Sequence, residues 1–421
     1  MSDEMLSSNY LTSGSIYFTG LGNGTDFDSM VTSLVQIEKR KSQQLEAWKA
    51  EWESKNEAFR GLNSSLLFLK TTMESMDTQG EFLIKSVTSS NETALTAAAG
   101  SNADLGTHTV EINQLAQNDI LVSTTGFSSS TDIVAPSASV FEFTYGGNTV
   151  SVDVAANSSL EALASYINAS GDNRDSNGQL MVRASLVNDG NNYYLQLRGM
   201  DLGSDNQVVV LDPPANTLAG FASADFDQTQ NAQNAQIRVD GWPTGTWIER
   251  STNVIDDVVS GITLTLKESG STVRINTENN LDAIREKIET FVSGYNDVMG
   301  QIQALTKVNQ MTNQGSLLTG NYGLQMISQN LKNIVASKAT GFDYDDDKFL
   351  ALGGLGITTD TDQNSVTFGL LKIDWDILND ALEKDAEGVS EVFGANLLPA
   401  WNSTDFRYYS AITGITKAGV Y

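Results

Sequence analysis

Two segments of the chain carry apolar side chains at alternating spacings of three and four residues. The first runs from Phe27 to Met76, with polar interruptions at Glu38, Lys41 and Lys55. Its clearest positions are Leu45, Trp48, Trp52, Phe59, Leu62, Leu66, Leu69, Met73 and Met76. Such spacing places a narrow apolar stripe on one face of a helix, as in a coiled coil. We expect a helix about 75 Å long if fifty residues continue unbroken.

The second segment repeats this pattern without interruption. Its eight positions are Leu281, Ile284, Ile288, Phe291, Tyr295, Val298, Ile302 and Leu305. A long apolar stripe must be buried against a partner, because an isolated helix gains too little to offset its loss of conformational entropy. We therefore expect these two helices to pack against each other as an antiparallel stalk resembling a coiled coil.

The residues between the two helices are dominated by short alternating runs with Gly, Asn and Asp between them, which is typical of β-strands. The runs are Ala94–Ala99, His108–Leu115, Val150–Val154, Tyr193–Leu197, Gln236–Val239 and Ile262–Leu266. One helix interrupts them, with Ser158 or Ser159 as its cap. Its expected buried positions are Leu160, Leu163, Ala164 and Ile167. Trp242 and Trp247 are expected at a buried hairpin tip, with exposed contacts as the alternative.

These patterns indicate a multidomain α+β protein, with β-rich head domains inserted between the stalk helices. Helical patterns also follow the second stalk helix, at Leu324–Val335 and Leu378–Phe393. We expect five parts: a mobile segment at 1–45, the stalk at 46–85 plus 279–395, an inner β domain at 86–125 plus 232–278, an outer α/β domain at 126–231, and the start of a further β insertion at 396–421. No C-terminal helix is seen in the sequence, and a C-terminal portion is expected to be missing.

Composition narrows the possible chemistry. The 421 residues include no cysteine and one histidine, His108, which excludes disulfides, thiolate metal sites and sites that need two histidines. The net charge of −27 argues against a nucleic-acid partner or an anionic membrane surface. No run approaches the roughly 18 apolar residues of a membrane helix, and residues 1–14 lack the layout of a secretory signal peptide.

Three motifs suggest sites, and each has a simpler interpretation. Gly20-Leu21-Gly22-Asn23-Gly24 resembles a dinucleotide-binding turn, but its third glycine is one position too early for G-x-G-x-x-G. Asp343, Asp345 and Asp347 alternate like a calcium loop, but Lys348 and Gly354 stand where Gly and Glu are needed. His108 has no accompanying nucleophile motif. We therefore expect no enzyme activity, no catalytic residue, no cofactor and no metal.

Several segments resemble flagellar cap proteins, the hook-associated protein 2 family. They occur in the family's order between residues 20 and 395: the opening Gly20–Val31, the strand Val110–Gln117, the strand Ala235–Gly241, the motif Asn253–Leu266 and the helix Asp282–Asn296. Residues 141–211, which contain Leu160–Asn168, are similar to the small repeat inserted in flagellins and cap proteins. Several motifs in one order are far more specific than any of them alone.

The resemblance implies a secreted protein that forms a ring-like homo-oligomer at the distal tip of the bacterial flagellum. There it would promote the folding and polymerisation of exported flagellin and prevent its loss. It also implies export by the flagellar type III route, with hook–filament junction proteins and an export chaperone as further partners. The segment 1–45 would dock into the filament through five apolar residues, Leu21, Phe27, Met30, Val31 and Leu34.

An alternative of another class is a surface adhesin. In that hypothesis the outer domain, residues 126–231, binds host glycans or mucin while the stalk displays it, and the two roles are compatible. A subunit of the filament or of its junction is a further alternative, although the Asn-rich helix opening of flagellins is not found here.

Overall fold

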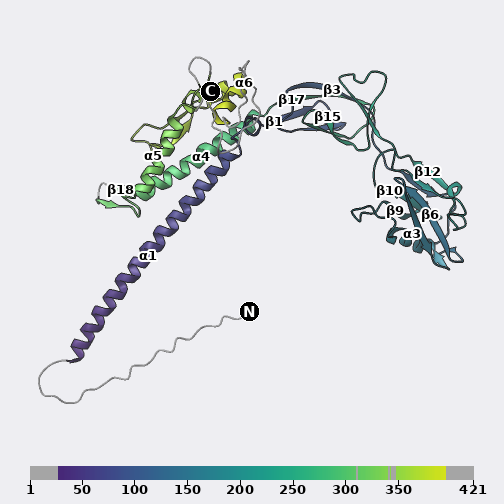
Figure 1. Cartoon of the computed structure of the whole chain (residues 1–421), viewed down its shortest axis with the longest axis horizontal. Coiled ribbons are helices and arrows are strands. Elements are labelled where there is room, and N and C mark those ends of the chain that lie inside the picture. The colour runs from purple at the N-terminus through teal and green to yellow at the C-terminus, as the bar shows by residue number, and fades with distance from the viewer. Residues whose placement is uncertain (1–26, 310–311, 340–341, 343–347, 395–421) are drawn as a thin grey trace, which may run out of the picture. The chain divides into compact units, whose positions relative to one another are not determined.

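The computed structural model describes residues 27–309, 312–339, 342 and 348–394. These residues form two compact units, one from described residues within 27–65 and 301–325 and one from described residues within 66–300 and 326–394. Helix α1 (Phe27–Glu74) and helix α4 (Leu281–Thr306) each contribute to both units. The 48 residues of α1, the long purple helix in Figure 1, correspond to about 72 Å.

The first unit joins the N-terminal part of α1 to the end of α4. Gln301 Nε2 donates to Ser65 Oγ at 2.7 Å, and the amide of Leu318 donates to the carbonyl of Leu305 at 2.9 Å. Strands β18 (Val308–Asn309) and β19 (Gln314–Gly315) form a short antiparallel pair. Leu62 and Ile302 are buried here, so the two helices contribute apolar side chains to this unit from distant parts of the chain.

The helical part of the second unit is built around α4. Short helix α2 (Gln79–Phe82) is capped by Thr78, whose hydroxyl accepts from the amide of Glu81 and donates to its carboxylate. Helices α5 (Tyr322–Ala336) and α6 (Trp375–Phe393), the 3₁₀ turn η2 (Leu352–Leu355) and the pair β20 (Ile357–Thr359) and β21 (Leu371–Ile373) follow α4. Stacking of Phe393 on Phe82, with ring centres 5.0 Å apart, joins α6 to α2.

Two antiparallel sheets share the core of the inner β region. One sheet has the order β1-β17-β3-β13-β14 and the other β15-β16-β2. Their strands are β1 (Lys85–Ser89), β2 (Leu95–Ala99), β3 (Gly106–Gln114), β13 (Ala235–Val239), β14 (Ile248–Arg250), β15 (Val254–Val259), β16 (Ile262–Leu266) and β17 (Ser271–Asn279). Successive side chains of a strand point to opposite faces of its sheet, so every second residue enters the core. Examples are Val110 and Ile112 of β3, and Ile262 and Leu264 of β16.

The outer region contains a four-stranded sheet of order β12-β4-β10-β9 and a three-stranded sheet of order β11-β6-β7, with a further pair β5-β8. The strands are β4 (Ile120–Ser123), β5 (Ile133–Ala135), β6 (Ser139–Tyr145), β7 (Asn148–Val154), β8 (Ser158–Ser159), β9 (Val182–Asn188), β10 (Tyr193–Gly199), β11 (Val208–Val210) and β12 (Phe226–Gln230), with the 3₁₀ turn η1 (Ser223–Asp225) before β12. Helix α3 (Leu160–Ala169) begins at Ser159, whose hydroxyl accepts from the amide of Ala162.

Several sequence-based expectations agree with these elements. All four expected apolar positions of α3 are buried in the outer core. The fold is a mixed α/β fold with a long N-terminal helix, and that helix includes residues 27–45, which the prediction had assigned to a mobile segment. Strand β4 pairs with β10 and β12, so residues 120–123 belong to an outer sheet and not to the inner one, to which we had assigned them. Residues 395–421, where a further β insertion was expected, lie outside the described part.

Candidate functional surfaces

The apolar stripe of α1 is exposed over its N-terminal half. The side chains of Leu45, Trp48, Trp52 and Phe59, named here the exposed stripe, are 58%, 66%, 68% and 41% exposed. Lys55 Nζ lies 5.0 Å from the centre of the Trp52 ring and covers part of it. From Leu62 onward the stripe turns inward: Leu62 and Leu69 are buried, and Leu66 and Met73 are half-buried.

The stripe of α4 is buried along its length. Ile284, Ile288, Phe291, Tyr295, Val298 and Ile302 are buried, and Leu281 and Leu305 at the two ends are half-buried. On the same helix Gly294 faces the Phe68 ring of α1, and a Cβ at Gly294 would lie in van der Waals contact with that ring, 3.4 Å away. The pattern of α4 thus corresponds to a packed surface, while only the C-terminal part of the α1 pattern does.

Hydrogen bonds connect the residues after α1 to α4 within the second unit. Lys287 Nζ donates to the carbonyls of Ser75 and Glu81 at 2.9 and 2.6 Å. Burial lowers the pKa of Lys287. Farther along α4, the Asn296 side chain donates to the carbonyl of Leu371 and accepts from its amide. These bonds pair the carbonyl of Ser75, which follows α1, the carbonyl of Glu81 in α2, and both backbone groups of Leu371 in β21.

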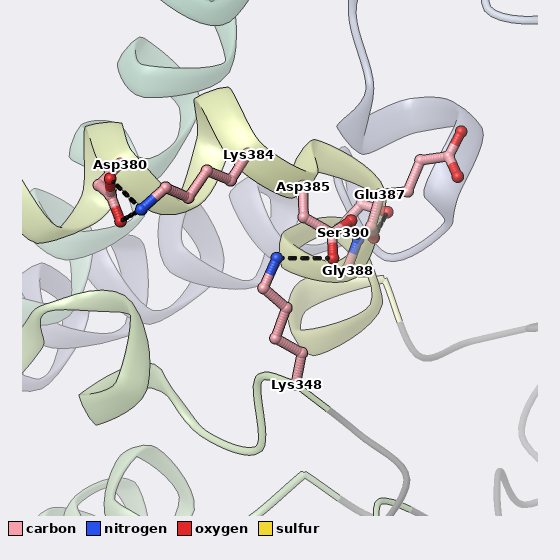
Figure 2. Close-up of polar contacts among 7 residues, drawn as sticks. All are labelled: Lys348, Asp380, Lys384, Asp385, Glu387, Gly388 and Ser390. Carbon is pink, nitrogen blue, oxygen red and sulfur yellow. Dashed lines mark hydrogen bonds and ion pairs between the residues drawn. The ribbon is translucent and has the colours of Figure 1, made fainter.

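Helix α6 is interrupted at Asp385, whose backbone is not helical (Figure 2). Its carboxylate accepts from the amide of Gly388 at 2.9 Å, which is the geometry of an N-cap for a new helical segment. The other oxygen forms an ion pair with Lys348 Nζ at 3.2 Å. A Cβ on Gly388 would lie 2.9 Å from that carboxylate, so the glycine makes the close approach possible.

The segment after this interruption carries Val389 and Phe393 into the core of the second unit. The Phe393 ring lies edge-on to Phe291, with centres 5.9 Å apart, as well as on Phe82. Lys384 and Asp380 form an exposed pair one turn before the interruption, and the Ser390 hydroxyl donates to the carbonyl of Glu387 (Figure 2). The interruption therefore sets the position of the aromatic cluster around α4.

An apolar groove of about 690 Å³ lies beside this cluster. The C-terminal part of α1, α4, the end of α5, the residues after it and the end of α6 line it, mainly through Leu66, Leu69, Met73, Phe291, Tyr295, Leu331, Ile334, Val335, Leu352, Val392 and Phe393. Ile334 is 70% exposed at this groove. The hydroxyl of Tyr295 is buried, with no hydrogen-bond partner in the described part of the chain.

His108 has a structural partner in the inner β region. Its Nδ1 lies 2.7 Å from Oδ2 of Asp240, and the amide of Thr109 donates to Oδ1 of the same carboxylate. The hydrogen bond with His108, followed by that from Thr109, lowers the pKa of Asp240. Asp240 and Gly241 have φ of 53° and 76°, which forms the tight turn between β13 and the following hairpin segment.

The two tryptophans of this hairpin differ. Trp242 is largely exposed, contrary to the buried tip that the sequence favoured, whereas Trp247 is half-buried with the guanidinium of Arg238 3.9 Å from its ring centre. The Arg238 guanidinium covers part of the Trp247 ring, whereas Trp242 is left exposed.

Other candidates from the sequence lie outside the described residues, namely Gly20–Gly24, Leu21 and the Asp343, Asp345 and Asp347 series. Phe27 begins α1, and Met30, Val31 and Leu34 on its first turns are exposed. Among the residues that the structure describes, no group of three or more His, Asp or Glu side chains is arranged to hold a metal ion. No described helix is long and apolar enough to cross a membrane.

Family models match most of this architecture in order. The model for the N-terminus of flagellar hook-associated protein 2 matches residues 23–119, and the model for its C-terminus matches residues 232–417. The chain belongs to the flagellar hook-associated protein 2 family. This confirms the resemblance noted in the sequence. A third model, the flagellin hook IN motif, matches residues 140–199, which include α3 and most of the outer strands.

Individual members of the hook-associated protein 2 family are similar over about three quarters of the chain or more. Flagellar hook-associated protein 2 of Escherichia coli K12 is 29% identical over 437 aligned positions, covering 96% of this chain and 88% of the relative. That of Aquifex aeolicus is 25% identical and covers 74% of this chain and 70% of the relative. The crystal structure of the D1-D2-D3 domains of the E. coli flagellar cap protein FliD is similar at a TM-score of 0.62 and 29% identity, covering 79% of this chain and 89% of that chain.

Sequence reasoning missed two features. The interruption of α6 at Asp385 went unseen because Leu378, Leu382, Val389 and Phe393 keep a continuous helical phase. The sequence did contain a signal for the interruption, because Asp385 is followed three residues later by Gly388 within the helical pattern. The groove was missed because its walls come from five segments that the sequence does not place together.

Proposed function

We propose that the chain is the filament cap at the distal tip of the bacterial flagellum. There it promotes the folding and polymerisation of exported flagellin and prevents its loss. The observation that carries the proposal is the match of N-terminal and C-terminal models of one family to residues 23–119 and 232–417 in order. The likeness to a cap-protein structure at 29% identity supports it.

The proposed mechanism is assembly without chemistry. Residues 46–85 and 279–395 form a helical stalk, which carries the inner and outer domains as inserted heads. Within the stalk Leu45, Trp48, Trp52, Phe59, Leu62, Leu66, Leu69 and Met73 face an apolar partner, as do Leu281, Ile284, Ile288, Phe291, Tyr295, Val298, Ile302 and Leu305. The buried stripe of α4 supports this arrangement for the C-terminal part of α1, and the exposed stripe leaves the N-terminal part for a partner molecule.

Docking to the filament is assigned to the N-terminal segment. Leu21, Phe27, Met30, Val31 and Leu34 enter the lattice of the last flagellin subunits, and subunits of the cap contact one another in a ring-like homo-oligomer. The exposure of Met30, Val31 and Leu34 supports an intermolecular role, because a stripe of large apolar side chains is costly to leave in water. Export by the flagellar type III route, with a dedicated chaperone and with hook–filament junction proteins as neighbours, belongs to the same proposal.

The test is a truncation that lacks residues 1–45, assayed with purified flagellin growing from filament seeds. We expect its β regions to remain folded by circular dichroism and its capping to be lost. A full-length variant, Met30→Asp with Leu34→Asp, should lose capping as well, whereas Gln43→Asp with Gln44→Asp on the same helix should retain it. A truncation that still caps filaments would refute the docking role. Glycan binding by a full chain that does not cap would favour the adhesin alternative.

A further inference from the structure

The β regions between residues 86 and 266 contain twenty acidic residues, five arginines and no lysine. Three of the arginines bond to groups of the chain itself: Arg250 to Asp257, Arg238 to Glu111, and Arg174 to the carbonyl of Asn168. The other two, Arg183 and Arg198, have no ion pair or side-chain hydrogen bond among the residues that the structure describes. Acidic residues are far more numerous here than arginines, so this pair is not left over for lack of carboxylates.

These two arginines lie directly opposite each other on neighbouring strands. Arg183 of β9 is the register partner of Arg198 of β10, and both side chains are exposed. Their neighbours Val182 and Leu197 enter the outer core, so the arginines point away from it. Directly opposite residues have Cβ atoms about 4.5–5.5 Å apart, and like charges at that spacing destabilise a sheet. The arginine face, defined by Arg183 and Arg198, therefore favours an anionic partner.

The three-stranded sheet of the outer region carries the opposite charge on its outward side. In the register of β6 and β7, Glu142 and Asp153 are diagonal neighbours, about 7–8 Å apart. Phe141 and Val152 next to them enter the same core, so both carboxylates point outward. Neither carboxylate forms an ion pair or hydrogen bond with another described residue, and β6, β7 and β11 contain no basic residue. Glu142 and Asp153 define the carboxylate face.

The arginine face and the carboxylate face belong to two sheets that share one core, and no ion pair of the described residues joins them. We propose that the arginine face of one copy binds the carboxylate face of a second copy. The pairing rests on the proposed self-association and names the surfaces that carry it. It is heterologous, because each copy uses two different surfaces, and such contacts continue from copy to copy and close into a ring when the rotation allows.

Charge complementarity identifies a second copy as the partner. With a net charge of −27, two copies repel each other unless a basic surface of one meets an acidic surface of the other. A guanidinium binds a carboxylate through two parallel N–H···O bonds, so two arginines suit a surface with two carboxylates. A small free anion fits less well, because a single exposed ion pair contributes little binding energy.

The surroundings of both faces suit a contact between proteins. Beside the arginines, Ser185 and Gln196 are register partners on the same side of the sheet, and the Ser185 hydroxyl donates to the Gln196 side chain at 3.3 Å. Val187 of β9 and Val209 of β11 are exposed on the outward sides of their sheets. Each face thus combines charge with polar and apolar area, as protein–protein interfaces do.

The experiment compares three full-length variants with the wild type by sedimentation velocity. The arginine-face variant is Arg183→Glu with Arg198→Glu, the carboxylate-face variant is Glu142→Arg with Asp153→Arg, and the swapped variant carries all four changes. Each of the first two should associate about tenfold more weakly than the wild type. The swapped variant should recover, as should a mixture of the first two, because every face again meets the opposite charge. Association of the wild type should also weaken as the salt concentration rises.

The carboxylate-face variant separates this pairing from general repulsion. It makes the net charge of −27 less negative, so repulsion alone would let it associate more tightly, whereas the pairing predicts weaker association. Circular dichroism checks that each variant is folded. The neutral variants Arg183→Gln with Arg198→Gln, and Glu142→Gln with Asp153→Asn, repeat the test with a milder change and should weaken association less.

Two results would overturn the pairing while leaving the cap proposal standing. One is wild-type association that the arginine-face and carboxylate-face variants leave unchanged. The other is a mixture of these two variants that associates no better than its components. A wild-type chain that stays monomeric at every concentration would contradict both the pairing and the proposed ring.

Discussion

The N-terminal half of α1 and the whole of α4 carry the same kind of apolar repeat but have opposite surroundings. Ile284, Ile288 and Tyr295 of α4 are almost fully buried, whereas Trp48 and Trp52 of α1 are about two-thirds exposed. The buried helix is tied at several points by polar bonds, such as those of Lys287 and Asn296. In the exposed half, ion pairs such as Lys49–Glu53 and Lys55–Glu51 join side chains of α1 itself.

This difference teaches that a heptad-like repeat predicts an apolar stripe that needs a partner surface, but does not predict whether that surface belongs to the same chain. For α4 the cover is the same chain. For the exposed stripe we propose a partner molecule in the assembled filament tip, since burying a large apolar side chain contributes about 1.5 to 3 kcal/mol. Substitutions in the two regions should therefore affect different quantities, stability in one and association in the other.

The largest expected contrast is between Phe291→Ala and Trp52→Ala. Loss of the buried Phe291 ring, which contacts Phe393, should lower the free energy of unfolding of the helical part by about 3–5 kcal/mol. Trp52→Ala should change it by about 0.5 kcal/mol or less, because the side chain is exposed. Urea unfolding followed by circular dichroism measures both. Equal losses would mean that the exposed stripe is packed within the chain.

A smaller loss of stability is expected when the hydrogen bonds that Lys287 forms near the end of α1 are removed. Lys287→Met keeps the length of the side chain but removes both donors to Ser75 and Glu81, which should cost about 1–2 kcal/mol. The control is Lys49→Met on the exposed half, whose ion pair with Glu53 spans 3.7 Å between exposed side chains. Unfolding curves that coincide for the two variants would show that these hydrogen bonds add no stability.

A substitution at Gly388, beside the interruption of α6, should change the free energy of unfolding by a similar or smaller amount. Gly388→Ala should destabilise by about 1–2 kcal/mol, because its Cβ would press on the Asp385 carboxylate that caps the following segment. Gly300→Ala is the matched control: this glycine lies in α4 with open space at the Cβ position, so alanine should stabilise the helix by about 0.5–1 kcal/mol. Thermal unfolding distinguishes the two signs, and a stabilising Gly388→Ala would contradict the capping geometry.

The smallest effect concerns pH at the β20–β21 turn. The Asp360 carboxylate accepts from the Thr367 hydroxyl at 2.7 Å and from the amide of Asp362, and these bonds lower its pKa to about 2. Since the folded pKa lies below the unfolded value of 3.8, the stabilisation is complete above that value and is lost as pH falls toward 2. The protection factors for amide exchange in residues 357–373, which are corrected for the intrinsic exchange rate at each pH, should therefore fall between pH 4 and 2 in the wild type. Asp360→Asn should remove this pH dependence of the protection factors, and an unchanged profile would refute the assignment.

Much of the fold follows from local patterns in the sequence. Leu160, Leu163 and Ile167 predicted the buried face of α3, and Leu378 and Phe393 predicted that of α6, because helical periodicity is set within a few residues. The pairing of β4 with β12 was beyond such reasoning, since Asp119 beside β4 bonds to Gln228 and to the amide of Val208, far along the chain. The groove likewise depends on segments that meet only in the folded chain.

The most direct test of the account is the accessibility of Trp48 and Trp52 in the assembled cap. Hydroxyl-radical footprinting with mass spectrometry reports the oxidation of each side chain, and it is compared between the chain alone and the chain bound to filament ends, with Trp242 as an exposed reference. We expect oxidation of Trp48 and Trp52 to fall strongly on assembly relative to Trp242. Equal oxidation of the two stripe tryptophans in both states would contradict the claim that the exposed stripe is an interface.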